Sequence, residues 1–382
     1  MSERVLVVAG EASGDRIAAL VAAALAERGI GCEGIAGPIA RAAGVATLAD
    51  GAPLAAMGLA DVAAALPRIA ASVARLLRRA RRDPPRAALL VNFTELNQRL
   101  GRLLRAGGTR VLWCVAPQVW AWRPRRIESL RGAFDRLAVI LPFEEPLWRA
   151  AGHDATYVGH PSLEAPALAL APDRARSRAR LGIAPDARAV AVLAGSRAGE
   201  VRRLADPLCE AARRLLGAGD ADTARVILAP GLDPRARALL ERRARAAGIA
   251  ALDADPDHGA AGCLDAFDVA LAASGTASLE AALAGAAPVV AYRLDPLTFA
   301  VARRLVHTPH IALPNVILGR RAFPELLQDH ARAAPIAAAA RDLLRDPGSS
   351  ARASAELRAA LAPPSPLPFG RRVADLLLPW LG

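Results

Sequence analysis

Short apolar runs that alternate with helical stretches constrain the fold of this chain more than any other feature. The apolar runs cover residues 5–9, 87–91, 110–115 and 137–141 in the first half, and 189–193, 225–229, 269–273 and 288–292 in the second half. Buried strands that are joined by helices pair in parallel and read as continuous apolar sequence. The alternation therefore predicts an α/β fold of two doubly wound, Rossmann-like domains with a cleft between them.

Two Pro-rich stretches divide the chain, whose 382 residues are too many for a single hydrophobic core. The first lies between Pro161 and Pro185, just before the strand–helix pattern restarts. The second covers residues 363–368 and precedes a short amphipathic end. We therefore predict an N-terminal domain over residues 1–165, a C-terminal domain over residues 166–362, and a final segment, residues 363–382, that packs back on an N-terminal domain.

The positive charge of the chain comes entirely from arginine. All 49 basic residues are arginine, the sequence contains no lysine, and the formal net charge is +12. The absence of lysine excludes a Walker-type phosphate lysine, a Schiff-base lysine and a lysine general base. The charge predicts an anionic partner, namely an acidic lipid surface, a phosphorylated ligand or nucleic acid. We discount nucleic acid because the arginines are spread over both halves and no nucleic-acid-binding module is recognisable.

The cysteines and histidines have no metal-binding spacing. Four cysteines and six histidines are dispersed along the chain, so we predict no metal site and a reduced, intracellular compartment. The apolar part of the N-terminus is too short for a signal peptide. Residues 269–292 come closest to a membrane span, but their glycines and Pro288 indicate a strand, a turn and a helix instead.

Two glycine-bearing turns join a predicted strand to a predicted helix. The segment Ser274-Gly-Thr-Ala-Ser-Leu-Glu280 begins a helix whose free N–H groups can bind a diphosphate without a cation, and Glu280 can accept hydrogen bonds from sugar hydroxyls. Taken alone, the segment fits an ordinary strand-to-helix connection equally well. The other turn, Gly10-Glu-Ala-Ser-Gly14, lacks the Gly-x-Gly-x-x-Gly spacing of dinucleotide-binding proteins. Together the turns indicate a nucleotide-sugar site.

Short motifs along nearly the whole chain resemble those of one family. In the first half they are Gly10-Glu-Ala-Ser-Gly-Asp15, Met57-Gly58, Ala116-Pro-Gln-Val-Trp-Ala-Trp-Arg123, Leu141-Pro-Phe-Glu144 and Tyr157-Val-Gly-His-Pro161. In the second half they are Gly195-Ser-Arg197 with Glu200, Ser274-Gly-Thr-Ala-Ser-Leu-Glu280, Leu313-Pro-Asn315 and Glu325-Leu-Leu-Gln328. By these motifs and their order, the chain resembles the lipid-A-disaccharide synthases, membrane-associated glycosyltransferases of Gram-negative lipid A assembly.

The resemblance implies a GT-B type glycosyltransferase fold and an inverting transfer that needs neither a metal nor a cofactor. The implied donor is UDP-2,3-diacylglucosamine and the implied acceptor is 2,3-diacylglucosamine 1-phosphate, called lipid X. Without a metal, Arg197 and the helix start must stabilise the departing UDP. The UDP-sugar is therefore expected on residues of the second half: Ser196, Arg197, Ser274, Gly275, Thr276, Ala277, Glu280 and Asn315.

The catalytic base is the point where this chain departs from the family pattern. The family has an aspartate after the strand that corresponds to residues 88–91 of this chain. This chain has Asn92 instead, and an amide cannot act as a base. Glu95, three residues on, and Glu11, in the first glycine turn, are the candidate bases. We prefer Glu11 because its turn is expected to face the cleft. A paralogue with altered or lost activity stays open.

The acceptor is expected in the first half, close to a membrane. Candidate acceptor-side residues are Ser13, Gly14, Asp15, Trp120, Arg123 and, with a weaker case, His160. Residues 62–82 predict a basic amphipathic helix that lies on an anionic membrane surface, although an ordinary helix packed on the sheet fits the same periodicity. Pro67 is expected near the start of this helix or at a break. The expected location is the cytoplasmic face of the inner membrane, as a peripheral protein.

Two rival functions come from different classes. One is a nucleotide-sugar epimerase, an isomerase of UDP-GlcNAc with the same two-domain arrangement. The other is a non-catalytic UDP-sugar-binding or lipid-binding paralogue, motivated by Asn92. The family resemblance also implies a swapped homodimer, in which residues 363–382 pack on the N-terminal domain of the partner subunit.

Overall fold

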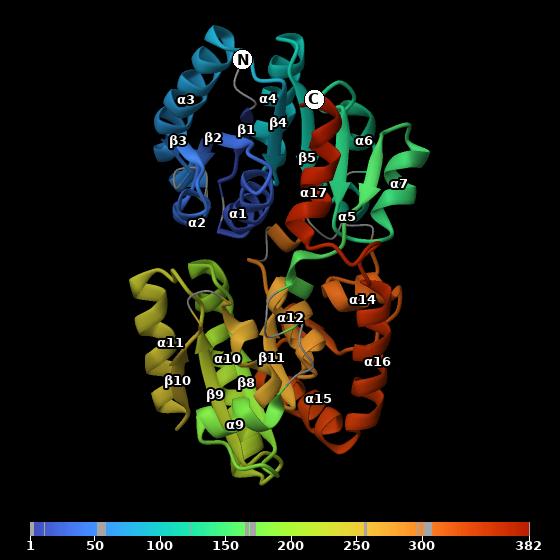
Figure 1. Cartoon of the computed structure of the whole chain (residues 1–382). Helices are drawn as coiled ribbons and strands as arrows, with labels where there is room; N and C mark the ends of the chain where they lie inside the picture. The colour runs from blue at the N-terminus through green and yellow to red at the C-terminus, as the bar shows by residue number, and fades with distance from the viewer. Residues whose placement is uncertain are drawn as a thin grey trace. The chain divides into compact units, whose positions relative to one another are not determined.

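The computed structural model describes residues 4–10, 12–51, 59–122, 124–164, 168, 173–255, 258–295, 298–300 and 308–381. The chain forms two compact units, shown in Figure 1. The first unit contains Met1–Pro161 together with Pro363–Gly382, and the second contains Ser162–Ala362. Each unit is built on its own parallel sheet with helices on its faces. Among the described residues, no helix is both long enough and apolar enough to cross a bilayer.

The sheet of the first unit has seven parallel strands in the order β3-β2-β1-β4-β5-β6-β7. Their bounds are β1 (Arg4–Val8), β2 (Gly31–Ala36), β3 (Ala46–Asp50), β4 (Ala87–Val91), β5 (Arg110–Cys114), β6 (Arg136–Val139) and β7 (Ala155–Tyr157). Apolar side chains cover both of its faces, as expected for a parallel sheet between helices. The helices of this unit are α1 (Ala12–Ala26), α2 (Pro38–Ala42), α3 (Leu59–Arg82), α4 (Thr94–Ala106), α5 (Val119–Trp122), α6 (Arg126–Ser129), α7 (Glu144–Ala150) and α17 (Phe369–Leu377), with the 3-10 turn η6 (Leu378–Trp380).

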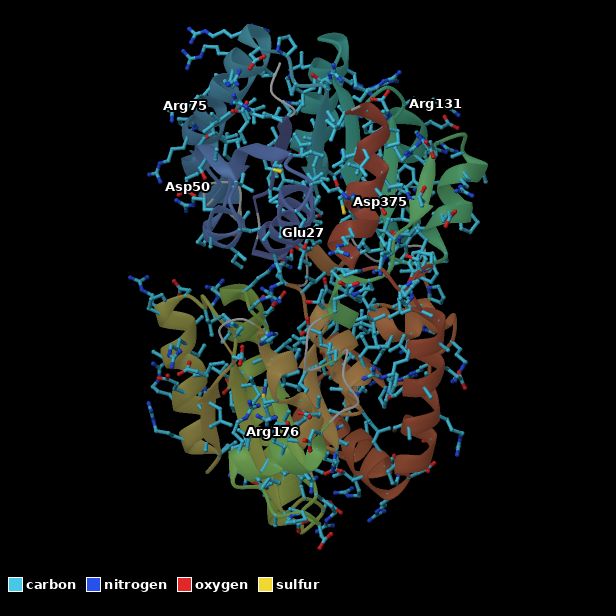
Figure 2. The ribbon with its side chains drawn as sticks, in the orientation of Figure 1. Glu27, Asp50, Arg75, Arg131, Arg176 and Asp375 are labelled. Atoms are coloured by element: carbon cyan, nitrogen blue, oxygen red, sulfur yellow. The ribbon has the colours of Figure 1, made fainter. Side chains whose placement is uncertain are left out.

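Helix α17, at the end of the chain, packs against α1 at its beginning (Figure 1). Gly370 permits this packing, since a Cβ at that position would lie 2.1 Å from the Leu20 carbonyl oxygen. Two ion pairs flank the contact, Arg28 to Asp375 at 2.7 Å and Arg371 to Glu27 at 2.9 Å; Glu27 and Asp375 are labelled in Figure 2. Buried apolar side chains of α17 therefore complete the core of the first unit.

The sheet of the second unit has six parallel strands in the order β10-β9-β8-β11-β12-β13. They are β8 (Ala189–Leu193), β9 (Thr223–Leu228), β10 (Ala250–Asp253), β11 (Val269–Ala273), β12 (Ala287–Tyr292) and β13 (Glu325–Leu327). The helices are α9 (Arg174–Leu181), α10 (Ala198–Gly217), α11 (Pro234–Ala246), α12 (Thr276–Ala284), α14 (Leu313–Leu318), α15 (Ala333–Arg345) and α16 (Pro347–Ala360). Short 3-10 turns are η2 (Pro161–Glu164), η3 (Ala260–Gly262), η4 (Leu264–Ala266) and η5 (Gln328–His330).

Both sheets have the strand order of a nucleotide-binding fold. In each, the first three strands run outward in one direction and the fourth strand returns to the other side of the first, so the order reverses between β1 and β4 and between β8 and β11. In open α/β sheets, ligands bind at the carboxyl ends of the strands at this switch point. The prediction of two Rossmann-like domains is confirmed, and the expected strands 87–91, 189–193 and 269–273 match β4, β8 and β11 residue for residue.

One expectation about local structure is wrong. Pro67 lies inside α3 rather than at its start, and the helix continues through it to Arg82. A proline removes one backbone hydrogen bond from a helix.

Candidate functional site

The two turns that we predicted to bind diphosphate lie at one edge of the second sheet. Strands β8 and β11 are direct neighbours, with Leu193 paired to Ala272. Residues 195–197 follow β8 and residues 274–277 follow β11, so both turns leave the sheet at its switch point. Because parallel strands end at the same edge, the fold brings these two segments together.

The start of helix α12 has the features of an anion site. Gly275 is its N-cap, and no side chain caps the helix there. With φ +149° and ψ −163°, Gly275 adopts a conformation that is open essentially to glycine alone. Buried Ser278 holds the turn by donating from Oγ to the Gly275 carbonyl oxygen at 2.7 Å, while Thr276 is exposed. The first N–H groups of α12 are thus available to an anion.

Arg197 extends its guanidinium from the neighbouring turn, and its side chain is 55% exposed, with Nη1 3.4 Å from Oε1 of Glu200. Glu200, one turn into α10, accepts hydrogen bonds from the backbone N–H groups of Ser196 at 3.2 Å and Arg197 at 3.4 Å. These amides, which we expected beside the diphosphate, are thus hydrogen-bonded to Glu200 in this structure. Gly195 permits the arrangement, since a Cβ there would lie 2.4 Å from the Glu200 carboxylate. Glu200 contacts one guanidinium nitrogen of Arg197, and the other guanidinium donors of this exposed side chain can face a ligand.

Asn315 does not have the role that we predicted for it. Its amide is completely buried, and Nδ2 donates to the Phe323 carbonyl oxygen at 2.8 Å and to Glu325 Oε1 at 2.7 Å. Oδ1 accepts from the N–H groups of Ala322 and Phe323, both at 2.9 Å. Two donors and two acceptor positions are therefore used within the protein, so the amide cannot also hold the uracil, ribose or phosphate.

Glu325 is a positioning residue that we did not predict, although it begins one of the family motifs. Its carboxylate accepts from Asn315 and from the N–H groups of Ile311, at 3.2 Å, and Ala312, at 3.1 Å. Ser274, directly after β11, donates to the Ile311 carbonyl oxygen at 3.1 Å. Ser274, which we predicted to bind the UDP-sugar, is thus hydrogen-bonded to the loop that Glu325 and Asn315 hold. These contacts keep the loop before α14 beside the end of β11.

Glu280 lies in α12, four residues after Thr276, and is partly buried.

The switch point of the first sheet brings together the residues around both candidate bases. Gly10 follows β1 and Asn92 follows β4, which is the neighbouring strand. Gly14 lies beside the end of β4, because a Cβ there would come within 3.5 Å of Val91. Ser13, in the same turn of α1, is exposed. Glu11 and Arg123, both predicted site residues, lie outside the described residues.

The backbone after β4 turns through a left-handed conformation at two residues that are not glycine. Asn92 has φ +54° and Phe93 has φ +41°. Side chain Nδ2 of the buried Asn97 holds this turn by donating to the carbonyl oxygens of Asn92, at 2.5 Å, and Val91, at 3.3 Å. Strained backbone of this kind costs stability and is concentrated at functional sites.

Glu95 is paired with a cation. Its carboxylate lies 2.7 Å from Nη1 of Arg126, which belongs to α6, and the Glu95 side chain is 74% exposed. A second contact of 3.4 Å joins Arg126 to Gln98. The Arg126 guanidinium therefore contacts one oxygen of this carboxylate in the folded protein.

Asp15 is a structural residue rather than an acceptor-side residue, which corrects the prediction. It is buried, and its carboxylate accepts from the N–H groups of Gly37 at 2.8 Å, Ile39 at 2.8 Å and Ala40 at 3.3 Å. These groups lie at the start of α2. Asp15 therefore fixes the connection between β2 and α2, and three hydrogen bonds leave it little capacity for a ligand.

Trp120 meets a buried carboxylate at the same edge of the first sheet. Its Nε1 donates to Glu144 Oε1 at 3.1 Å, and its ring makes an edge contact with Phe143. Glu144 also accepts from the Leu141 N–H at 3.3 Å. Burial raises the pKa of Glu144 to about 7, although the hydrogen bonds from Trp120 and Leu141 act in the opposite direction.

The Glu144→Gln variant is expected to lose the fall in stability with rising pH that Glu144 contributes in the wild type. In the folded protein, the raised pKa keeps a proton on Glu144 that the unfolded chain releases above its ordinary value of 4.5. The contribution of Glu144 to the free energy of unfolding should therefore fall as pH rises from about 4.5 to 7, by about 3 kcal/mol. Over this range the variant should become more stable relative to the wild type. Urea unfolding can be followed by tryptophan fluorescence, since all five tryptophans lie in the first unit.

The matched control is Glu128→Gln, because Glu128 is exposed. This variant should keep the pH dependence of the wild type. An equal slope in the Glu144→Gln variant and the wild type would contradict the assignment of this titration to Glu144.

His160 is buried, and burial lowers its pKa to about 4. The imidazole is therefore neutral near pH 7, and the weak substrate-side role that we predicted does not fit a shielded, uncharged ring. The preceding residue, Gly159, has φ +84°, and a Cβ there would lie 2.9 Å from the Arg372 guanidinium. Arg372 is itself buried and donates to the Val158 carbonyl oxygen at 2.6 Å. This part of the chain is a packed structural region.

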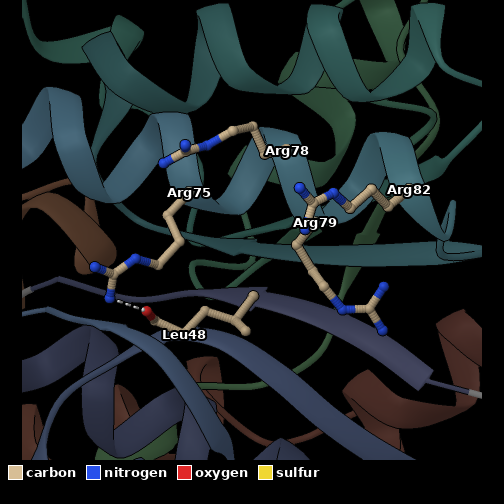
Figure 3. Close-up of a pocket in the computed structure, with 5 residues that line it drawn as sticks. All are labelled: Leu48, Arg75, Arg78, Arg79 and Arg82. Carbon is tan, nitrogen blue, oxygen red and sulfur yellow. Dashed lines mark hydrogen bonds between the residues drawn. The ribbon is translucent and has the colours of Figure 1, made fainter.

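The apolar stripe of α3 is mostly turned inward over its second half. Leu76 is completely buried and Ala80 is 9% exposed, and Ile69 and Leu77 pack against the same core. Leu66 is the exception, at 55% exposure. The expected membrane-facing stripe is therefore wrong for these packed residues, because they cover the sheet. The solvent-facing side of α3 carries exposed arginines, namely Arg75, Arg78, Arg81 and Arg82. Figure 3 labels three of them, Arg75, Arg78 and Arg82.

The described residues contain no group of three or more His, Cys, Asp or Glu side chains placed to hold a metal ion. Cys32, Cys114, Cys209 and Cys263 are buried free thiols, and burial raises their pKa values to about 11 or 12.

Comparison with known proteins identifies the family of this chain. The model of the family described as lipid-A-disaccharide synthetase matches residues 5–360. The lipid-A-disaccharide synthase of Anaeromyxobacter sp. (strain K) is 38% identical over 385 residues, which cover 99% of this chain and 97% of that protein. That of Bordetella pertussis (strain Tohama I) is 36% identical over 373 residues, or 94% of each chain.

Solved structures with less than 25% identity share the fold. The UGT89C1 protein of Arabidopsis thaliana, solved with UDP, has a TM-score of 0.66 at 15% identity and covers 100% of both chains. MurG of Acinetobacter baumannii has a TM-score of 0.56 at 15% identity over 99% of both chains. A putative UDP-N-acetylglucosamine 2-epimerase of Listeria monocytogenes has a TM-score of 0.63 at 14% identity, covering 100% of this chain and 96% of that one. The fold alone therefore does not separate transferases from epimerases.

Proposed function

The chain belongs to the lipid-A-disaccharide synthase family, and we propose that it moves 2,3-diacylglucosamine from UDP-2,3-diacylglucosamine to 2,3-diacylglucosamine 1-phosphate. The products are the lipid A disaccharide 1-phosphate and UDP, and the transfer is inverting. The observation that carries the proposal is the arrangement at the second switch point, where an uncapped helix start and an exposed arginine lie on adjacent turns in a chain of this family.

The donor site follows from this arrangement. The N–H groups at the start of α12 and the Arg197 guanidinium bind the diphosphate, and they stabilise the negative charge that develops when the bond to the sugar breaks. A planar guanidinium suits two phosphate oxygens at once. Glu280, further along α12, accepts hydrogen bonds from sugar hydroxyls, and Ser274, Thr276 and Ala277 line the approach.

The acceptor site lies at the first switch point in this proposal. A hydroxyl of the acceptor attacks the anomeric carbon as the diphosphate leaves, and Glu11 takes the hydroxyl proton. The turn that carries Glu11 leaves β1 beside the end of β4, where the family aspartate is replaced by Asn92. Ser13, Gly14, Trp120 and Arg123 are the proposed acceptor contacts.

The acylated substrates place the protein at the cytoplasmic face of the inner membrane, as a peripheral protein. The net charge of +12 supports attraction to an anionic surface. Homodimers that exchange residues 363–382 belong to the same proposal, and size measurement in solution tests them.

A transfer assay tests the function and separates its rivals. Purified protein with both lipid substrates should release UDP and form disaccharide in equal amounts. Well-folded protein that binds UDP but forms no disaccharide would instead be the non-catalytic paralogue. Turnover of UDP-GlcNAc without any acylated acceptor would identify an epimerase.

A further inference from the structure

The end of β12 lies next to the helix start of the proposed donor site. Strands β11 and β12 are neighbours, with Ala273 paired to Ala291. Ser274 and Tyr292 are the residues that follow this pair, and neighbouring strands lie about 4.8 Å apart. The fold therefore brings Tyr292 to the edge of the sheet where Gly275 begins α12.

Gln328, the last residue of the family motif that starts at Glu325, holds the segment after Tyr292 in place. Its side chain accepts a hydrogen bond from the Leu294 N–H at 2.7 Å and donates one to the Leu294 carbonyl oxygen at 3.1 Å. Gln328 directly follows β13 and has φ +48°, a left-handed conformation that is uncommon outside glycine. Strained backbone of this kind is concentrated at functional sites. The two hydrogen bonds fix the path of the chain as it leaves β12.

Arg203, in α10, contacts the same segment. Its Nε donates to the Arg293 carbonyl oxygen at 2.9 Å, and Arg293 Nε in turn donates to the Gln328 carbonyl oxygen at 3.2 Å. Helix α10 begins directly after Arg197 and packs on β8 and β11 (Figure 1). The segment that follows Tyr292 is thus tied to the helix that follows the Arg197 turn.

The Tyr292 hydroxyl has no hydrogen-bond partner among the described residues, and the side chain is partly buried. Burial raises the pKa of Tyr292, and the charge of Glu200 acts in the same direction. The charges of Arg203 and Arg197 lower this pKa, so the phenol lies within reach of the charged groups of the donor turn. Because the pKa is above its ordinary value of 10.0, the hydroxyl keeps its proton near pH 7 and can donate a hydrogen bond.

A phosphate oxygen is the partner that these surroundings favour. The guanidinium groups of Arg197 and Arg203 attract a diphosphate, and a hydrogen bond to a charged oxygen is stronger than one between neutral groups. We propose that the Tyr292 hydroxyl donates a hydrogen bond to the diphosphate of the UDP-sugar, and that Gln328 is the positioning residue for the segment beside it. This inference rests on the proposed function, which supplies the donor.

The variant Tyr292→Phe tests the inference by removing one oxygen atom. Calorimetry should show that UDP binds about 10- to 100-fold more weakly than to the wild type, the usual effect of losing one hydrogen bond to a charged group. kcat/KM for the donor should fall at least as much, while KM for the acceptor stays unchanged. Thermal unfolding followed by circular dichroism should match the wild type, because the hydroxyl has no described partner within the protein.

Tyr157→Phe is the matched control. The chain contains two tyrosines, and Tyr157 is also partly buried but belongs to the first unit. This variant should keep the UDP affinity of the wild type. Equal UDP affinity in Tyr292→Phe and the wild type would overturn the inference, and so would an equal loss in the Tyr157→Phe control.

Gln328→Ala tests the positioning role. It removes both hydrogen bonds to Leu294 and should weaken UDP binding by up to the same factor as Tyr292→Phe. In the double variant, the loss should stay close to that of Tyr292→Phe alone, because Gln328 acts through Tyr292. Losses that multiply would show that Gln328 acts independently and would remove its positioning role.

UDP binding and disaccharide formation can fail separately. A wild type that binds UDP through Tyr292 but forms no disaccharide would contradict the proposed transfer and leave the assignment of Tyr292 standing. If the wild type forms disaccharide and Tyr292→Phe keeps its UDP affinity, only the assignment of Tyr292 is overturned.

Discussion

Replacing Arg197 by alanine should lower kcat/KM for the UDP-sugar by about 100- to 1,000-fold, which is typical of the loss of one group that stabilises charge in a transition state. The Arg197 side chain leaves the turn after β8 and is 55% exposed, so its removal creates no cavity. The free energy of unfolding should stay close to that of the wild type. Steady-state rates of UDP release at varied donor concentration measure the effect.

Arg202→Ala is the matched control, since Arg202 is exposed on α10, the helix that follows the turn carrying Arg197. It removes the same charge and should leave kcat/KM nearly unchanged. Arg197→Lys should recover only part of the rate, because an ammonium lacks the planar fork of the guanidinium. A loss of less than about 3-fold in the alanine variant would remove Arg197 from the donor site, since a single charge-stabilising group is worth far more.

The second large effect is expected at the base. Glu11→Gln should lower kcat by about 100- to 10,000-fold, the usual contribution of a positioned general base. Glutamine keeps the size of the side chain and removes its ability to take a proton. Single-turnover measurement of disaccharide formation reports the chemical step without product release.

Glu95→Gln makes the same chemical change at the neighbouring turn. We expect a much smaller loss there, because Glu95 is paired with Arg126 at 2.7 Å. Adding Asn92→Asp to the Glu11→Gln variant should restore part of the rate, since it places a carboxylate where the family has one. If Glu95→Gln causes the larger loss, Glu95 is the base, and if neither variant is impaired, both assignments fail.

The fold was predictable because fully buried strands have recognisable runs of apolar residues in the sequence. Strands β4, β8 and β11 are buried along their whole length, and each reads as an uninterrupted apolar run with bounds that matched the prediction. The left-handed turn at Asn92 and Phe93 has no such sequence pattern, because asparagine adopts this conformation at only a minority of positions and phenylalanine rarely does. It depends on Asn97, which reaches back five residues to hold it.

The family motifs identified the right segments, but only the structure assigned roles within them. Glu200 is occupied with the amides of its own turn, Asp15 holds the start of α2, and the Asn315 amide is saturated by the loop around Glu325. In each motif a polar group that was expected to meet a ligand, namely the amides beside Glu200, the Asp15 carboxylate and the Asn315 amide, bonds the protein itself. A sequence shows which donors and acceptors are present, and not which of them the fold has already satisfied.

Sequence alone determined the two Rossmann-like domains, the family and the segments at the strand ends, because strand burial, glycine turns and motif order are local properties of the chain. Tertiary structure decided which side chains remain available at those ends. It also decided that α3 turns its apolar residues inward and its arginines outward, since that depends on which face the sheet covers. Whether a polar group is buried or already hydrogen-bonded depends on contacts between residues far apart in sequence, such as Trp120 and Glu144. A local sequence pattern does not predict such contacts.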